Sequence, residues 1–330
     1  MAGGEREALG APLAAVMAPV TGESTVSDLR RLSGGASRET WMFDSGRDRF
    51  VLQRARPGAL RGLATETAVL RAAARAGVPV PELVVDGSES VALERPFIVV
   101  RAVEGETIAR KILRDEEYAG ARGTLATQMA RAAARISRID PADVPGLVAE
   151  DQLEQYRAVL DATGEAHPVF EVALRWLESN RPPASAPRVV HGDFRLGNMI
   201  VNRDGLAAVL DWELAHLGDP LEDLGWMCVR AWRFGGARPA AGLSGYDEIL
   251  EAWADESGIT ELGTTVTASA LRWWEALGTL KWGIMCIVQA QTHLKGVVRS
   301  HELAAIGRRV CENEYDLVVL LEELMGGLRP

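Results

Sequence analysis

Short runs of alternating hydrophobic and polar residues dominate the first hundred positions of the chain. Five of them have the composition of strands: residues 27–32, 39–43, 49–54, 82–86 and 97–102. Turn sequences such as Asp44-Ser45-Gly46 separate neighbouring runs, which is typical of an antiparallel meander. A helix is expected over residues 5–18, before the first strand. A second helix has an apolar face at Leu63 and Leu70 and should end at Gly77.

Helical periodicity replaces this pattern after residue 104. The helical patterns cover residues 114–138, 151–161, 168–179 and 303–324. The segment from Phe234 to Ser244 is rich in Gly, Pro and Ala and predicts a mobile loop. We therefore predict an α+β fold with two domains. Residues 1–103 would hold the sheet and one key helix, and residues 104–330 would be mainly helical.

Composition narrows the class of protein. The chain has 330 residues, of which 47% are hydrophobic, and a net charge of -10. This charge disfavours binding to nucleic acids or anionic membranes, because clustered Lys and Arg provide most of that binding. The cysteines Cys228, Cys286 and Cys311 lie far apart and lack metal-ligand spacing. We therefore expect reduced, packed thiols in a cytoplasmic protein.

The strongest chemical signal is a group of polar residues around a short predicted hairpin. Asn202-Arg203-Asp204-Gly205 is a turn sequence between two strand-like runs. Folding one run onto the other brings Asp211 close to Asn198, and a carboxylate beside an amide oxygen suits Mg²⁺. Asp193 would then lie where it can orient a hydroxyl for attack on a phosphate. We predict a phosphoryl-transfer site with Asp193 as catalytic residue and Asn198 and Asp211 as metal ligands.

Residues next to these three are predicted to support them. Arg195 could reach the transferred phosphate, although a surface arginine fits the same sequence. His191 could act in catalysis, but the favoured interpretation is a buried imidazole that braces the loop through hydrogen bonds. Asp219, before Pro220, is expected to cap a helix, and Asp223 in the first turn of that helix should support the Asp193 loop.

The first domain contains candidates for the phosphate-binding part of the site. Gly34, Gly35 and Ser37 lie in a turn between two strands, where small residues let backbone N–H groups approach phosphates. Glu66 falls on the apolar face of its helix and therefore needs a cationic partner. We predict an ion pair between Glu66 and Arg54, at the end of the third strand, which would align the phosphates of ATP. The alternative is a structural ion pair between Glu66 and another of the numerous arginines.

With these motifs, the chain resembles the aminoglycoside phosphotransferase-like kinases and, among them, the phosphotransferase domains linked to acyl-CoA dehydrogenases. The resemblance covers nearly the whole chain and rests most specifically on His191-Gly192-Asp193, Asn198 and Asp211-Trp212-Glu213. It implies a protein-kinase-like fold with two lobes, and ATP and Mg²⁺ as cofactors. It also implies that Val100, on the strand before the interlobe hinge at Val103-Glu104-Gly105, helps to bind the nucleotide.

The chain departs from the family at two positions in the first lobe. The family usually has a basic residue directly after the Val-Leu of the third strand, where this chain has Gln53. Arg38 stands where the family more often has Asn. An arginine in the nucleotide loop could supply part of the missing charge.

The resemblance implies a hydroxylated small molecule as phosphate acceptor, with a hydroxyacyl-CoA or related metabolite favoured over an aminoglycoside. An aminoglycoside-type antibiotic kinase is one alternative. A nucleotide-binding regulator without turnover is another, motivated by Gln53. A metal-dependent hydrolase built on His191, Asp193, His216 and Asp219 is a third. The residues leave the oligomeric state and the choice between ATP and GTP open.

Overall fold

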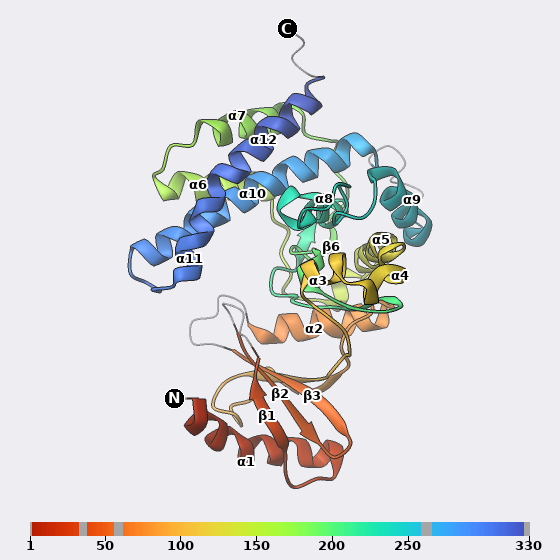
Figure 1. The fold of residues 1–330 in the computed structure, drawn as a ribbon, viewed down its shortest axis with the longest axis vertical. Helices are drawn as coiled ribbons and strands as arrows, with labels where there is room; N and C mark the ends of the chain where they lie inside the picture. The colour runs from red at the N-terminus through yellow and green to blue at the C-terminus, as the bar shows by residue number, and fades with distance from the viewer. Residues whose placement is uncertain (1, 33–37, 56–61, 259–265, 327–330) are drawn as a thin grey trace.

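The computed structural model describes residues 2–32, 38–55, 62–258 and 266–326, and it has two lobes (Figure 1). The first lobe is built on an antiparallel sheet with the strand order β1-β2-β3-β5-β4. Its strands are β1 (Ser27–Arg31), β2 (Arg38–Ser45), β3 (Asp48–Ala55), β4 (Leu83–Gly87) and β5 (Phe97–Arg101). Each strand coincides with a predicted run. The predicted antiparallel sheet is confirmed, except that β5 lies between β3 and β4.

Two helices pack against the sheet. Helix α1 (Ala2–Thr21) covers one face, and α2 (Leu63–Arg75) lies between the sheet and the second lobe in Figure 1. Val99 of β5 belongs to the core beside α1, whereas its neighbour Val100 belongs to the core beside α2. This alternation decides which strand residues can reach the space between the lobes.

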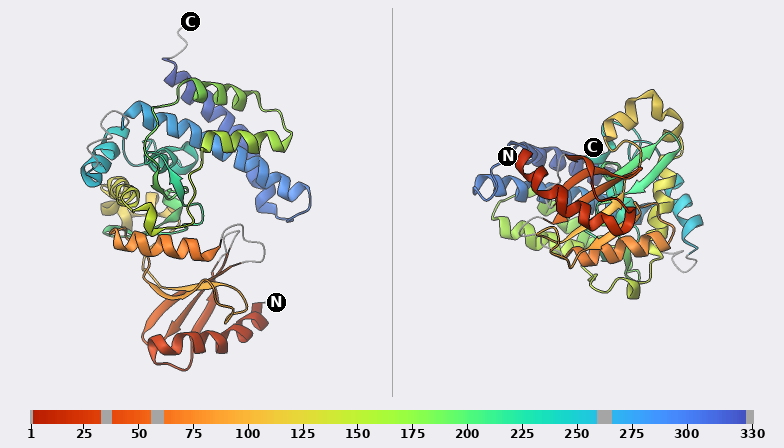
Figure 2. Two further views of the ribbon diagram at one scale, coloured as in Figure 1. Left: turned by 180° about the vertical axis from the view of Figure 1, so that it is seen from behind. Right: turned by 90° about the horizontal axis from the view of Figure 1, so that it is seen from below.

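The second lobe is mainly helical. Its α-helices are α3 (Ala109–Arg114), α4 (Ala119–Arg122), α5 (Leu125–Ser137), α6 (Gln152–Thr163), α7 (Pro168–Ser179), α8 (Glu222–Cys228), α9 (Tyr246–Ser257), α10 (Ala268–Leu294), α11 (His301–Ile306) and α12 (Val310–Leu324). Helix α10 packs against both α8 and α12, and α1 and α12 lie at opposite ends of the molecule (Figure 2). Within the described ranges, no helix is long and apolar enough to cross a membrane.

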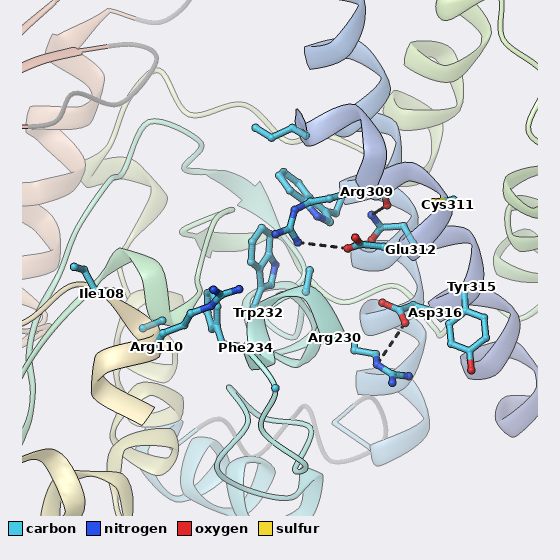
Figure 3. Close-up of a pocket in the computed structure, with 16 residues that line it drawn as sticks. Ile108, Arg110, Arg230, Trp232, Phe234, Arg309, Cys311, Glu312, Tyr315 and Asp316 are labelled. Atoms are coloured by element: carbon cyan, nitrogen blue, oxygen red, sulfur yellow. Dashed lines mark hydrogen bonds and ion pairs between the residues drawn. The ribbon is translucent and has the colours of Figure 1, made fainter. Parts of the chain in front are cut away.

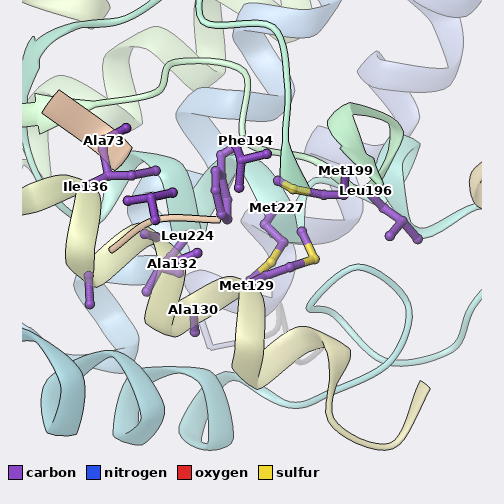
Figure 4. Packing of buried hydrophobic residues seen from close by; sticks show 14 of the residues in the cluster. Ala73, Met129, Ala130, Ala132, Ile136, Phe194, Leu196, Met199, Leu224 and Met227 are labelled. Carbon is purple, nitrogen blue, oxygen red and sulfur yellow. The ribbon is translucent and has the colours of Figure 1, made fainter. Parts of the chain in front are cut away.

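Two short antiparallel sheets carry the polar residues singled out above. They are formed by β6 (Arg188–Val190) with β9 (His216–Gly218), and by β7 (Met199–Asn202) with β8 (Gly205–Val209). The segment between β6 and β7 is held from behind by the core: Phe194 and Leu196 are fully buried near Met129 of α5 and Met227 of α8 (Figure 4). Burial of these two side chains leaves the polar residues beside them facing outward.

Two predicted helices are interrupted in the structure. The helix predicted over residues 114–138 is divided among α3, α4 and α5, and Arg122 donates hydrogen bonds of 3.0 and 2.7 Å to carbonyls at the end of α3. The last predicted helix is divided into α11 and α12 at Gly307. A Cβ at Gly307 would lie 2.7 Å from the Cβ of Ala290 in α10, so this close crossing favours glycine.

Packing differs from the prediction at two further places. The segment from Phe234 to Ser244, predicted as a mobile loop, is anchored by the buried residues Ala240 and Ala241. Cys228 and Cys286 are buried thiols, as predicted. Cys311 is exposed, so the prediction of a packed thiol is wrong at that position.

Candidate active site

Strands β7 and β8 form the predicted hairpin. Met199 pairs with Val209, and the N–H of Leu210 donates a 2.8 Å hydrogen bond to the carbonyl of Asn198. These contacts bring Asp211 beside Asn198. Asp211 has a φ of 67°, a left-handed conformation that is costly for a residue other than glycine and that concentrates at functional sites.

The loop after β6 turns sharply at Gly192, which has a φ of 80°. A Cβ at this position would lie 2.4 Å from the carbonyl oxygen of Leu214, so glycine is required. Asp223, in the first turn of α8, accepts hydrogen bonds from the N–H groups of His191 (2.8 Å) and Gly192 (2.9 Å). The predicted support of this loop by Asp223 is confirmed.

His191 is fully buried behind the loop. Its Nε2 lies 2.9 Å from the carbonyl of Leu210, and its Nδ1 accepts a 3.2 Å hydrogen bond from the N–H of Asp193. These partners assign the ring proton to Nε2. Burial lowers the pKa of His191 to about 4, so the imidazole is neutral at pH 7. These contacts agree with the favoured interpretation that His191 braces the loop through hydrogen bonds, and a direct part of His191 in catalysis stays a prediction.

Three side chains hold the carboxylate of Asp193. Trp226 donates a 2.7 Å hydrogen bond to Oδ1, and Nε of Arg195 lies 3.0 Å from the same oxygen. Asn198 donates from Nδ2 to Oδ2 at 2.6 Å. Because its amide nitrogen is used in this way, Asn198 keeps Oδ1 for another partner, such as a metal ion.

Trp226 is a residue that the sequence analysis misses. It lies three positions after Asp223 on α8, and residues at that spacing share one side of a helix. The prediction that Asp223 supports the loop therefore contained a signal for Trp226.

Lys281 of α10 is a second missed residue, buried beneath the loop with 5% of its surface exposed. Its Nζ lies 3.0 Å from Oε1 of Gln152 and 3.4 Å from both the carbonyl of Gly192 and Oε1 of Glu222. The charge also lies 5.1 Å from the ring centre of Trp226, within cation–π range. Lys281 therefore connects α8, α10 and the loop.

A pocket of about 300 Å³ between the lobes ends at Asp211. Residues of both lobes line it, including Gln53, Glu66, Val100, Ile200, Leu210 and Trp212. Asp211 is exposed at this end of the pocket. Partial burial of its carboxylate, followed by the charges of Glu213 and Asp193, raises the pKa of Asp211 to about 6. Carboxylates that repel one another beside an amide oxygen fit a divalent cation, which would offset the repulsion.

The predicted ion pair between Arg54 and Glu66 is wrong. Arg54 donates a 2.8 Å hydrogen bond to Oε2 of Glu39 and is buried on the α1 side of the sheet. Successive strand residues point to opposite faces, so Arg54 turns away from the pocket that Gln53 lines. Glu66 is held instead by Arg38, whose guanidinium contacts both oxygens of the carboxylate.

The remaining residues predicted to bind the nucleotide belong to two groups. Val100 lines the interlobe pocket from β5. Gly34, Gly35 and Ser37 lie outside the described residues, and their contacts with phosphates stay predictions.

A second, larger cavity of about 1060 Å³ opens in the helical lobe (Figure 3). Its labelled walls are formed by Ile108, Arg110, Arg230, Trp232, Phe234, Arg309, Cys311, Glu312, Tyr315 and Asp316. Arg195 connects this cavity with Asp193, because its guanidinium lies 4.7 Å from the ring centre of Trp232 while its Nε contacts the carboxylate.

A small sheet lobe and a helical lobe enclose a pocket that ends at Asp211, which lies beside Asn198. This is the architecture of a protein-kinase-like phosphotransferase. The chain matches the phosphotransferase enzyme family over residues 28–259, more than half of its length, and belongs to that family.

The chain is also similar to individual known proteins, in sequence and in fold. The chain is 28% identical over 223 residues to acyl-CoA dehydrogenase family member 10 of Mus musculus, which covers 61% of this chain and 20% of the mouse protein. The chain thus spans about a fifth of that relative. In fold it is similar to a Ralstonia eutropha protein described provisionally as an aminoglycoside phosphotransferase, with a TM-score of 0.73, 21% identity and coverage of 94% and 98% of the two chains. Aminoglycoside phosphotransferase APH(4)-Ia, solved as a ternary complex with AMP-PNP and hygromycin B, gives a TM-score of 0.63 at 16% identity, over 96% and 99% of the two chains.

These findings confirm the predicted family and the kinase-like fold. The family match also confirms the predicted class of enzyme, a phosphotransferase. Transfer from ATP to an alcohol group is part of the proposal below. The domain boundary after residue 103 and the roles of the individual site residues stay predictions.

Proposed function

We propose that this chain is a Mg²⁺-dependent kinase that phosphorylates a hydroxyl group of a small metabolite. One observation carries the proposal. Asp193 accepts hydrogen bonds from two side chains. One is Asn198, which lies beside the end of the interlobe pocket, and the other is Arg195, which lies beside the large cavity. A carboxylate between a nucleotide pocket and an acceptor cavity is suited to phosphoryl transfer.

Each residue of the site has its own task in this proposal. Asp193 orients the acceptor hydroxyl and accepts its proton. Asn198, through Oδ1, and Asp211, through its carboxylate, hold Mg²⁺ with the hard oxygen ligands that this ion prefers. Arg195 keeps Asp193 in place and offers a cation to the transferred phosphate. When bound, Mg·ATP supplies the phosphoryl group.

The large cavity supports an acceptor that combines an apolar part with an anionic part. The rings of Trp232, Phe234 and Tyr315 give its wall flat apolar surface. A volume of about 1060 Å³ exceeds what a single sugar ring needs. An extended metabolite is therefore favoured.

The charges of this wall leave one arginine in excess. Glu312 pairs with Arg309 at 3.7 Å, and Asp316 pairs with Arg230 at 3.4 Å. Arg110 is exposed and makes no ion pair with any residue of the described ranges. An anionic group on the acceptor would complement this surplus charge.

A hydroxyacyl-CoA has these properties, because its acyl chain is apolar and its CoA part carries phosphates. The similarity to acyl-CoA dehydrogenase family member 10 supports the same direction. An aminoglycoside fits less well, since it carries several ammonium groups that a surplus arginine would repel. We therefore place hydroxyacyl-CoA or a related metabolite before aminoglycosides as acceptor.

A phosphate-transfer screen tests the proposal. The full chain would be incubated with radiolabelled ATP and Mg²⁺ against hydroxyacyl-CoAs, free hydroxy acids and aminoglycosides. We expect labelled hydroxyacyl-CoA with the wild type and none with Asp193→Asn, which should still bind Mg·ATP. Transfer to aminoglycosides alone would identify an antibiotic kinase. Binding of Mg·ATP without transfer or hydrolysis would identify a nucleotide-binding regulator.

The metal-dependent hydrolase finds no support in the hydrogen bonds of its proposed ligands. Both ring nitrogens of His216 have partners, the carbonyl of Leu214 at 2.9 Å and Glu222 at 3.0 Å, and both nitrogens of His191 are also used. Among the residues that the structure describes, no group of three or more His, Cys, Asp or Glu side chains is arranged for a metal.

A cytoplasmic location and the lack of nucleic-acid and membrane partners are part of our proposal.

A further inference from the structure

The interlobe pocket contains several carboxylates where the phosphates of a nucleotide would lie. Glu66 lines the pocket from α2, and Asp211 lies at its end. The negative charge of Glu213 is close enough to Asp211 to help raise the pKa of that carboxyl. A triphosphate in such surroundings needs a side-chain cation in addition to Mg²⁺. Gln53, which lines the pocket from β3, is neutral.

Two arginines near the pocket have their guanidinium groups engaged elsewhere. Arg54 is buried against Glu39 on the opposite face of the sheet. Arg101, at the end of β5, pairs with Asp48 at 2.9 Å and with Glu82 at 2.8 Å. Neither guanidinium is available to a ligand in the pocket.

Arg38 differs from both. It begins β2, where Thr40 pairs with Gln53 and both line the pocket, so alternation puts Arg38 on the same face of the sheet. Its guanidinium contacts both oxygens of Glu66.

Arg38 also lies within electrostatic reach of the metal-binding end of the pocket. Burial lowers the pKa of Arg38, while the negative charges of Glu213 and Asp211 act in the opposite direction. A guanidinium keeps its charge in proteins, and this one lies between Glu66 on one side and the Asp211 end of the pocket on the other.

We propose that Arg38 is the cation that binds the phosphates of the nucleotide, and that Glu66 holds it in position. This inference rests on the proposed function. A guanidinium has five N–H donors in a planar fork, so two can remain on Glu66 while others face phosphate oxygens. The phosphate-binding charge thus comes from β2 rather than from β3.

Calorimetry with two ligands tests the proposal without relying on turnover. Mg·ATP and adenosine would each be titrated into the full-length wild type, Arg38→Ala and Arg47→Ala. Arg38→Ala should bind Mg·ATP about tenfold to a hundredfold more weakly, as expected for loss of a charge-assisted contact. Its affinity for adenosine, which has no phosphates, should be unchanged. Arg47, an exposed arginine in the turn between β2 and β3, is the matched control and should affect neither ligand.

A second variant moves the charge instead of removing it. In the Arg38→Ala background, Gln53→Lys places a cation on the neighbouring strand, facing the same pocket. This double variant should bind Mg·ATP more tightly than Arg38→Ala. It should recover at least about a third of the difference in log Kd between Arg38→Ala and the wild type. Arg38→Lys keeps the charge without the planar fork and should lose less than Arg38→Ala, which keeps the test open if the alanine variant does not fold.

The outcomes separate this inference from the proposed function. Equal Mg·ATP affinity in folded wild type and Arg38→Ala would overturn the inference and leave the proposed kinase intact. A parallel loss of Mg·ATP and adenosine affinity would also overturn it, because that pattern belongs to a structural role. A wild type that fails to bind Mg·ATP would overturn both.

Discussion

The indole N–H of Trp226 donates a 2.7 Å hydrogen bond to Oδ1 of Asp193, while Asn198 donates to Oδ2 of the same carboxylate. The two oxygens therefore have different partners, which fixes the rotation of the carboxylate. Asp223, on the same helix as Trp226, holds the backbone of the loop. The orientation of the proposed catalytic residue thus depends on α8.

Trp226→Phe should lower kcat without weakening nucleotide binding. The substitution keeps most of the ring in the core and removes one hydrogen bond to a charged group, an interaction worth about 1.5–3 kcal/mol. We expect kcat to fall about tenfold, with little change in the KM for ATP, in steady-state assays. Trp253→Phe is the control, because the buried N–H of Trp253 has no hydrogen-bond partner among the residues that the structure describes. Equal effects of the two substitutions would contradict the positioning role.

Asp193→Asn and Asp211→Asn should separate chemistry from metal binding. Loss of the proton acceptor at Asp193 should reduce transfer by about 10²–10⁴-fold and leave the Mg²⁺ requirement unchanged. Loss of a charged ligand at Asp211 should raise the Mg²⁺ concentration for half-maximal activity by about tenfold or more. Activity measured across a Mg²⁺ titration checks both expectations. Identical Mg²⁺ curves for the two variants would argue against this division of roles.

The arrangement of the two proposed metal ligands could be predicted because its geometry is local. A turn sequence sets the register of β7 with β8, and the register decides that Asp211 returns to Asn198. Asp223 could be placed in the same way, from its position in the first turn of a helix. Each of these inferences needs only neighbouring residues in the chain.

The partner of Glu66 could not be predicted, because it depends on strand pairing. Arg54 and Gln53 are consecutive, yet they face opposite sides of the sheet, and the actual partner, Arg38, comes from a different strand. The contact between Lys281 and the loop could not be predicted for a similar reason. Lys281 reaches the carbonyl of Gly192, which lies 89 residues earlier, through the packing of α10.

Lys281→Met should destabilise the protein, because it leaves Glu222 without one of its buried cations. Breaking such a pair from one side costs about 3–5 kcal/mol in the free energy of unfolding. The double variant Lys281→Met/Glu222→Gln removes both charges but also breaks the pair between Glu222 and His216, so it should recover only part of that loss. Urea unfolding measures the difference, with the exposed Lys295→Met as control, expected to change stability by less than about 0.5 kcal/mol. A Lys281→Met variant as stable as Lys295→Met would contradict the prediction.

His216 should make stability depend on pH. Burial alone would lower the pKa of His216, but the charge and hydrogen bond of Glu222 outweigh it and raise the pKa above 6.5. A raised pKa of this kind contributes stability that is fully present below about pH 6.5 and is lost as the pH rises through the folded-state value. The free energy of unfolding should therefore fall more steeply above about pH 6.5 in the wild type than in His216→Gln. Urea unfolding of both proteins between about pH 6 and pH 9 gives the comparison. Parallel profiles would mean that His216 is not the group responsible.

Arg110→Ala should weaken binding of an anionic acceptor without affecting the chemical step. Arg110 lines the large cavity, whereas Arg114, on the same exposed side of the short helix α3, pairs with Asp115 at 2.7 Å and is outside the cavity wall. We expect the KM for a hydroxyacyl-CoA to rise about threefold to tenfold in Arg110→Ala, and more in Arg110→Glu, with kcat and the KM for ATP nearly unchanged. Arg114→Ala should behave as the wild type. Because the contact is exposed, the effect of Arg110→Ala should shrink at about 1 M salt. Steady-state kinetics at low and high salt measure these changes, and an equal rise in KM for both alanine variants would remove the case for an anionic acceptor at Arg110.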